Sequence, residues 1–141
     1  MTGRYFVDSK VWLYLFTEDD AGKRDGGDTF FRERTGADAL CVSWQIVNEV
    51  WGNLLRKGKS DEVARGMVEH ILRSCELVDF SLDLLLRAHD LRSRHAVSFW
   101  DSLVVAAALT ADCDCLVSED MQDGKRFDGL LVRNIFTRDG R

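Results

Sequence analysis

The order of apolar and polar residues along the chain predicts strands that alternate with helices. Short apolar runs typical of buried strands occupy residues 4–7, 39–42, 76–80, 115–117 and 130–135. Apolar residues have helical spacing at residues 9–16, 44–57, 81–94 and 98–112, and in a further segment that opens at 60–62. Residues 18–28 hold three glycines and many charges, which predicts a solvated loop, and residues 29–35 are expected to form a short helix.

Three of these helices have an apolar stripe that is expected to face the core. The stripes comprise Ile46, Val47, Val50, Trp51, Leu54 and Leu55 in the first, Val63, Met67, Ile71 and Leu72 in the second, and Leu84, Leu85, Ala88 and Leu91 in the third.

Alternation of this kind predicts an α/β protein in which helices cover both faces of a parallel sheet. We expect a single domain over residues 1–141, a three-layer α/β/α sandwich with a mainly parallel sheet of about five strands. Right-handed crossovers place the carboxyl ends of parallel strands at one edge of the sheet, and ligand sites lie at that edge. Residues that follow strands are therefore the first candidates for chemistry.

Composition narrows the function classes without choosing among them. A hydrophobic share of 45% and an aromatic share of 10% fit a globular protein that buries a core. The net charge of −5 gives no support to nucleic-acid binding, although a local basic patch can act within an acidic whole. We recognise no signal sequence and no membrane span, and the four cysteines are too scattered for disulfides or zinc, so a cytoplasmic protein is expected.

One predicted helix holds a single charge near its start. Every residue from Leu103 to Leu109 is apolar, so this helix is expected to be buried on most sides, and Asp101 lies in its first turn. Ser98 and Asp101 have the spacing of a capping box, in which the helix dipole favours the acid. The alternative is a metal-binding or catalytic role for Asp101, and the local sequence leaves both open.

Three more acids are candidates for the same edge. Asp8 follows the first predicted strand, and Asp120 comes shortly after the fourth. Glu49 lies in the middle of the helix at residues 44–57, away from the apolar stripe, so it faces either a cleft or solvent. Each has an ordinary structural interpretation: a helix N-cap for Asp8, a turn residue for Asp120 and a solvated surface acid for Glu49.

Carboxylates that gather at one edge repel one another unless cations hold them. Hard oxygen ligands of this kind suit Mg²⁺ or Mn²⁺. A pair of such ions can activate water and stabilise the leaving oxygen in phosphodiester cleavage. Taken jointly, the acids favour a metal site over a set of unrelated structural residues.

Four segments connect this interpretation to a known family. They read FVDSKVWLYLF, NEVWGNLLRKG, RHAVSFWDSLVVAAAL and LVSEDMQDG, in that order over nearly the whole chain. Together they resemble the PIN-domain ribonucleases and, within these, the toxin half of VapBC toxin–antitoxin pairs. The resemblance implies endonucleolytic cleavage of RNA with a divalent metal, a cognate antitoxin and a homodimer.

Carried over by motif, the resemblance makes Asp8, Glu49, Asp101 and Asp120 the metal-binding acids. Ser118 takes the position of the Ser or Thr two residues before the last acid. There it is expected to orient that acid or a metal-bound water.

Lys10 departs from the family pattern, because many relatives have Asn or a small polar residue two places after the first acid. A lysine here can pair with an acid or contact phosphate, and it can also weaken metal binding. Glu119 and Asp123 are extra acids nearby that can share ligand duty. His95 matches a common family residue, for which a structural role is expected.

Three other functions remain open at this level. A receiver-type phosphoacceptor would need adjacent acids after the first strand, where Asp8 is followed by Ser9 and Lys10. A PIN-like module that binds RNA or protein without cleavage has only Lys10 in its favour. A purely structural domain does not account for acids at the sheet edge. An RNA cleavage assay with and without EDTA separates the enzyme from all three.

Overall fold

One six-stranded sheet runs through the computed structural model, which describes residues 3–136. Its strands are β1 (Arg4–Val7), β2 (Ala39–Ser43), β3 (Glu76–Val78), β4 (Cys115–Val117), β5 (Arg126–Phe127) and β6 (Leu130–Arg133). They lie in the order β3-β2-β1-β4-β6-β5, and every neighbouring pair is parallel except β5 with β6. The expected mainly parallel sheet is confirmed, with one more strand than the sequence suggested.

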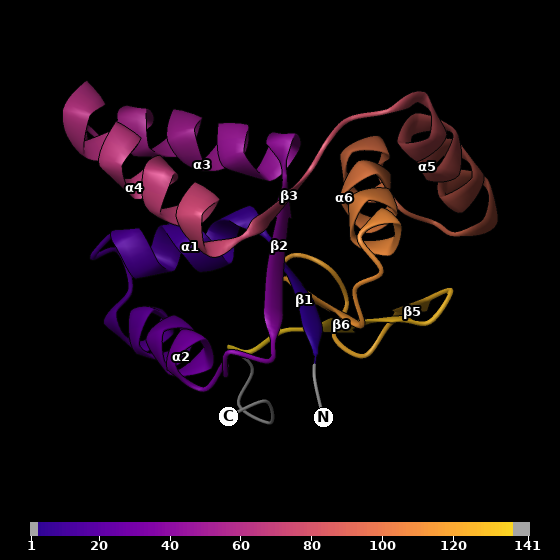
Figure 1. The fold of residues 1–141 in the computed structure, drawn as a ribbon, viewed down its shortest axis with the longest axis horizontal. Coiled ribbons are helices and arrows are strands. Elements are labelled where there is room, and N and C mark those ends of the chain that lie inside the picture. Colours follow the sequence, from indigo (N-terminus) through magenta and orange to yellow (C-terminus); the bar gives the residue numbers. More distant parts are fainter. Residues whose placement is uncertain (1–2, 137–141) are drawn as a thin grey trace.

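Within residues 3–136, six helices connect the strands and cover both faces of the sheet. They are α1 (Ser9–Phe16), α2 (Ala21–Arg32), α3 (Trp44–Arg56), α4 (Asp61–Ser74), α5 (Leu82–Arg94) and α6 (Phe99–Thr110). Figure 1 shows α1 to α4 on one side of the sheet and α5 with α6 on the other. The α/β class and its two outer helical layers are thereby confirmed.

The helix α6 is buried on most sides, as its uninterrupted apolar sequence predicts. Every residue from Ser102 to Ala108 is buried, and the helix packs against α5, β2 and β4. It begins after Ser98, whose hydroxyl accepts a hydrogen bond from the Asp101 amide at 3.1 Å. Because α6 leads into the parallel strand β4, its first turn lies at the carboxyl edge of the sheet.

The loop expected at residues 18–28 is wrong, because most of this segment belongs to α2. The helix begins after Asp20, whose carboxylate accepts a hydrogen bond from the Lys23 amide at 3.0 Å. Glycines lower the intrinsic helix propensity of the segment, but packing against α1 and the burial of Phe30 stabilise it. The short helix expected at residues 29–35 is the second half of α2.

Strand β5 is a second difference from the sequence-based expectation. It pairs with β6 through a tight hairpin turn at Asp128 and Gly129, whose φ angles are 49° and 96°. An Asp-Gly pair favours two-residue hairpin turns because both positions need positive φ. The turn signal was present in the sequence, whereas the strand itself is only two residues long.

Some side chains expected in apolar stripes are exposed instead of buried. They are Trp51 and Leu55 of α3, Val63 and Leu72 of α4, and Leu85 of α5. Each of these helices packs on one side only, so the buried stripe is narrower than the apolar one. In α3, for example, it narrows to Ile46, Val47, Val50 and Leu54.

The part of the chain that the structure describes has no helix that is both long and apolar enough to cross a membrane. Cys41, Cys75, Cys113 and Cys115 are all free thiols.

Candidate functional site

The strands β1 and β4 are neighbours and end at the same level of the sheet. Their register pairs Val7 with Val117, so Asp8 and Ser118 are the first residues past the strands. The Asp8 amide extends the pairing by donating to the Val117 carbonyl oxygen at 2.9 Å. Asp8 is therefore fixed at the sheet edge where ligands of parallel sheets bind.

Asp8 is a buried carboxylate, 9% exposed, and is also the N-cap of α1. The Ser118 hydroxyl donates to its Oδ2 and the Ser9 amide to its Oδ1, both at 2.8 Å. Burial raises the pKa of Asp8 despite these hydrogen bonds, and the charges of Asp120 and Asp101 raise it further. A cation beside Asp8 would relieve this unfavourable negative charge.

The contact of Ser118 with Asp8 differs from the contact expected from the sequence. Ser118 was expected to orient the last acid, Asp120, or a water. Its buried hydroxyl binds the first acid because β1 and β4 are adjacent in register, while Asp120 lies two residues farther along the loop.

Asp101 lies in the first turn of α6, and its carboxylate takes no part in capping the helix. The cap uses the Asp101 amide and the Ser98 hydroxyl. Among residues 3–136, the Asp101 carboxylate has neither a hydrogen-bond donor nor an ion-pair partner, and it lines a cleft together with Asp120 and Lys125. Only the Ser98 half of the expected capping box is therefore present: the Ser98 hydroxyl caps the Asp101 amide, while the Asp101 carboxylate stays free in the cleft.

Glu49 lies in the middle of α3, on the helix face that the sequence left open between cleft and solvent. Although the residue is exposed, loss of water around its carboxylate raises the pKa to about 7, and the charges of Asp8, Asp101 and Asp120 contribute to this rise. A hydrogen bond from Gln45 acts in the opposite direction. The negative charges of the other three acids thus reach this exposed face of α3.

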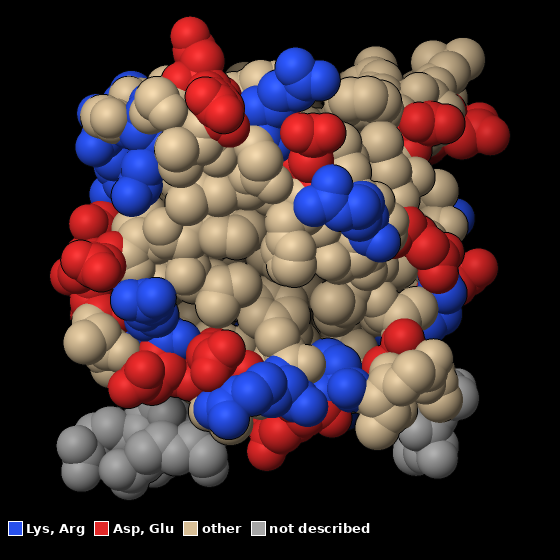
Figure 2. Space-filling model, turned by 60° about the vertical axis from the view of Figure 1, so that its left-hand side comes forward, with Lys and Arg blue, Asp and Glu red and all other residues tan. Residues whose placement is uncertain are grey.

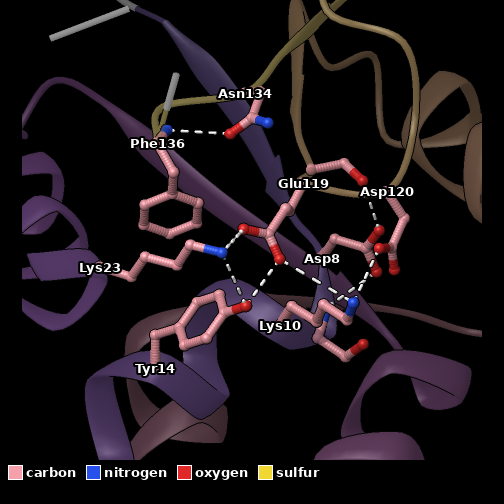
Figure 3. A network of polar contacts seen from close by, with 10 residues as sticks. Asp8, Lys10, Tyr14, Lys23, Glu119, Asp120, Asn134 and Phe136 are labelled. Carbon is pink, nitrogen blue, oxygen red and sulfur yellow. Dashed lines mark hydrogen bonds and ion pairs between the residues drawn. The ribbon is translucent and has the colours of Figure 1, made fainter. Parts of the chain in front are cut away.

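Asp120 lies on the exposed loop after β4 and is paired with Lys10. The Lys10 ammonium nitrogen is 2.9 Å from Asp120 Oδ1 and 3.9 Å from Glu119 Oε1 (Figure 3). The hydrogen bond to Asp120 raises the pKa of Lys10, so the ammonium form is favoured. Of the outcomes considered from sequence, pairing with an acid is the one found.

Glu119 points away from the cleft, toward α1 and α2. It accepts a hydrogen bond from the Tyr14 hydroxyl at 2.6 Å and forms an ion pair with Lys23 (Figure 3). Burial alone would raise the pKa of Glu119, but the contacts with Lys23 and Tyr14 lower it. Sequence reasoning missed Tyr14 and Lys23, since Lys23 lay in the segment expected to be a loop.

Asp123 and His95 have structural contacts. The Asp123 carboxylate accepts a hydrogen bond from the Asn134 amide at 2.8 Å, which ties the loop after β4 to the segment after β6. The His95 ring packs edge-on against Phe127 at a centroid distance of 4.9 Å. These contacts agree with the structural role expected for His95.

The acids at this edge come from separate elements: Asp8 follows β1, Glu49 lies on α3, Asp101 opens α6 and Asp120 follows β4. Their oxygen donors are those that Mg²⁺ and Mn²⁺ prefer, so the donor set fits such a cation in its chemistry. The arrangement of these side chains is open, however, because residues 3–136 contain no group of three carboxyl, imidazole or thiol side chains that could hold a metal ion. Lys10 contributes to this open arrangement, because its ammonium group pairs with a carboxylate oxygen of Asp120.

Comparison with protein families gives one match. A family model described as PIN domain matches residues 5–128 of the chain. This range includes the four acids, Ser118 and Lys10. A search of curated protein sequences found no match.

Solved structures with a similar fold include toxins and toxin–antitoxin complexes. VapC20 of Mycobacterium tuberculosis, described as a toxin that cleaves the sarcin–ricin loop, is 20% identical, with a TM-score of 0.68 over 82% of this chain and 89% of its own. VapBC2 of Rickettsia felis, bound to a promoter DNA fragment, is 17% identical, with a TM-score of 0.67 over 93% and 98%. A toxin–antitoxin complex from Klebsiella pneumoniae is 16% identical, with a TM-score of 0.70 over 90% and 95%. At these identities the likeness shows a shared fold.

Proposed function

The chain belongs to the PIN-domain family, whose members are typically nucleases, and on that premise we propose that it is a metal-dependent endoribonuclease. The proposed substrate is RNA, the cofactor is Mg²⁺ or Mn²⁺, and the reaction is hydrolysis of a phosphodiester bond. We further propose that the protein acts as a toxin that a cognate antitoxin restrains, as in the toxin–antitoxin complexes that share its fold.

The gathering of acids at the carboxyl edge of the sheet is the observation that supports this activity. Burial and neighbouring charges raise the pKa values of Asp8 and Glu49, so keeping both ionised in the folded protein is costly. Asp101 adds a carboxylate with no hydrogen-bond or ion-pair partner in residues 3–136. A divalent cation would offset these charges.

In the proposed site, Asp8, Glu49, Asp101 and Asp120 hold the metal. The bound ion supplies Lewis acidity, which makes water a better nucleophile and polarises the phosphate. Ser118 and the Ser9 amide fix the orientation of the Asp8 carboxylate.

Charge on the surface is mixed and gives no broad track for RNA on the face that Figure 2 presents. Lysine and arginine side chains alternate with acids over this face, and uncharged residues fill most of the area between them (Figure 2). We propose that phosphate binding depends on the lysines next to the acids, Lys10 and Lys125. A weak dependence of RNA affinity on salt would follow.

A protein partner is supported by exposed aromatic side chains close to the cleft. Trp44 opens α3, and Phe99 and Trp100 open α6, with 46%, 46% and 62% exposure. Gln45 Nε2 donates to the Trp100 carbonyl oxygen at 3.4 Å, which places the two helix starts side by side. We propose that the antitoxin covers these aromatic residues and places a basic side chain among the acids.

A homodimer is the second assembly that we propose. Leu82 and Leu86 of α5 are 69% and 57% exposed, and Phe80 just before them is 61% exposed. A surface of this kind is costly in water and suits a second copy of the chain. Light scattering of the purified protein measures the mass directly, and a monomer at all concentrations would contradict this proposal.

Incubation of a single-stranded RNA with Mg²⁺, Mn²⁺ or EDTA tests the proposed activity. We expect cleavage with either metal and none in EDTA. Asp101→Asn should reduce cleavage by several orders of magnitude while the fold is kept, because the helix cap uses the Asp101 amide. Asp83→Asn, which removes an acid from the first turn of α5, is the matched control and should cleave normally.

Near-normal cleavage by Asp101→Asn would refute the assignment of the site. A module that binds RNA without cutting it predicts a stable complex and intact RNA under every condition. The toxin role is tested separately, by expression without the partner gene. Harmless expression of an active nuclease in its own host, with no partner gene beside it, would contradict that role.

A further inference from the structure

Lys10 is a charged residue at the proposed site, and its position in α1 is unfavourable for a lysine. It lies in the first turn of α1, where the helix dipole favours acids and disfavours a lysine. Its ammonium nitrogen reaches across to the loop after β4 and lies 2.9 Å from Asp120 Oδ1 (Figure 3). Both side chains are about half exposed, 47% and 55%, so the pair adds little to stability. Stability of the fold therefore does not account for this lysine.

The other lysines near the acids have different partners. Lys23 forms its ion pair with Glu119. Lys125 lines the cleft, but its ammonium nitrogen lies 5.3 Å from the centre of the Phe127 ring. Within residues 3–136, no ion pair reaches the other three acids of the proposed site. Lys10 is thus the cation that contacts this group of acids.

Carboxylate sites that hydrolyse phosphodiesters often hold two divalent ions about 3.5–4 Å apart. The Lys10 ammonium group beside Asp120 disfavours a second metal ion there, because the two positive charges would repel each other. We infer that Lys10 replaces one metal ion: the acids bind a single divalent cation, and Lys10 supplies the second positive charge beside Asp120. This inference rests on the proposed nuclease function.

The chemistry of an ammonium group defines what Lys10 does in this position. It has three N–H donors, of which Asp120 Oδ1 accepts one. The remaining donors are available to a phosphate oxygen of the RNA. Lys10 is not a Lewis acid, so it holds the phosphate and balances its charge, while the activation of water stays with the single metal ion.

Calorimetric titration with Mn²⁺ tests the inference through stoichiometry, without any need for turnover. Wild type should bind one Mn²⁺ per chain. Lys10→Met, which keeps an unbranched side chain of nearly the same length and removes its charge, should bind two. Lys10→Arg restores the charge and should again bind one. Arg65→Met breaks an exposed ion pair with Glu69 on α4 and should leave the value at one.

The same variants give a second readout in RNA cleavage. The rate of wild type should rise with the first power of the Mn²⁺ concentration at low metal, and that of Lys10→Met with about the second power. Two ions in wild type, or one ion in Lys10→Met, would overturn the inference while the nuclease function stands. A wild type that binds no Mn²⁺ would overturn both.

Discussion

Ser118 and Asp8 form a buried polar contact within the site. Ser118 is 1% exposed and Asp8 9% exposed, and the hydroxyl lies 2.8 Å from the carboxylate oxygen. Away from water, a hydrogen bond to a charged group is strong, and its loss leaves the acceptor without a partner. In the proposed site, Ser118 would therefore act on the cation through Asp8, as a positioning residue.

Ser118→Ala removes this hydrogen bond without adding volume. The free energy of unfolding should fall by about 1.5–3 kcal/mol, the usual worth of a hydrogen bond to a charge. Mn²⁺ affinity, measured by titration, should weaken roughly 10–100-fold because Asp8 loses its orientation. Ser93→Ala on the exposed side of α5 is the control and should change stability by less than about 0.5 kcal/mol. Unchanged Mn²⁺ affinity in Ser118→Ala would mean that Ser118 has no positioning role.

Single residues also show where sequence reasoning ends. Asp8 and Asp101 were placed at the sheet edge because a strand end and a helix start can be recognised in the sequence. The contact of Lys10 with Asp120 joins residues 110 positions apart and depends on strand order and side-chain rotamers. Periodicity encodes neither, so the partner of Lys10 had to come from the structure.

At the level of elements, the first turn of α6 keeps the helix cap separate from the carboxylate that we propose as a metal ligand. The Ser98 hydroxyl and the Asp101 amide cap the helix, and the Asp101 carboxylate remains free in the cleft. Burial of the rest of the helix holds this turn in place. Substitutions at the two positions should therefore have separable effects.

Melting curves in EDTA and in Mn²⁺ measure that separation. Ser98→Ala loses the cap and should be about 1 kcal/mol less stable in both buffers. Asp101→Asn should be as stable as wild type or more stable in EDTA, because it removes one of several mutually repelling carboxylates. Mn²⁺ at about 100 times Kd should stabilise wild type by about 2.7 kcal/mol, and Asp101→Asn should lose most of this gain. If Asp101→Asn is destabilised in EDTA and the wild type does not respond to Mn²⁺, Asp101 has a purely structural role.

Elements with a strong apolar pattern could be predicted, and those held by tertiary contacts could not. The run from Leu103 to Leu109 predicted α6 and its burial. The segment of α2 has three glycines, and its helix depends on packing against α1, which local propensity does not report. The order of the strands in the sheet could not be predicted for the same reason, because it depends on contacts between segments far apart in the sequence.

Over the whole molecule, the cost of the acidic edge should appear in the dependence of stability on pH. Glu49 has a pKa of about 7 in the folded protein against an ordinary value of 4.5. Between these values the folded state retains a proton that the unfolded state has released, so the free energy of unfolding falls as pH rises. Asp8, whose pKa is also raised, acts in the same direction. Glu119, whose pKa is lowered, acts in the opposite one.

Glu49→Gln isolates one contribution to this slope. In EDTA, urea unfolding at about pH 5, 6, 7 and 8 should show wild type losing stability relative to Glu49→Gln as pH rises through about 7, and the loss should level off about one pH unit above that value. Glu69→Gln on the solvent face of α4 is the control for the loss of one surface acid. With Mn²⁺ the order should reverse, because the ion binds the ionised carboxylates of the folded protein and stabilises wild type more as they lose their protons. A difference between wild type and Glu49→Gln that is independent of pH in EDTA would show that neither loss of water nor the charges of the other acids raise the pKa of Glu49.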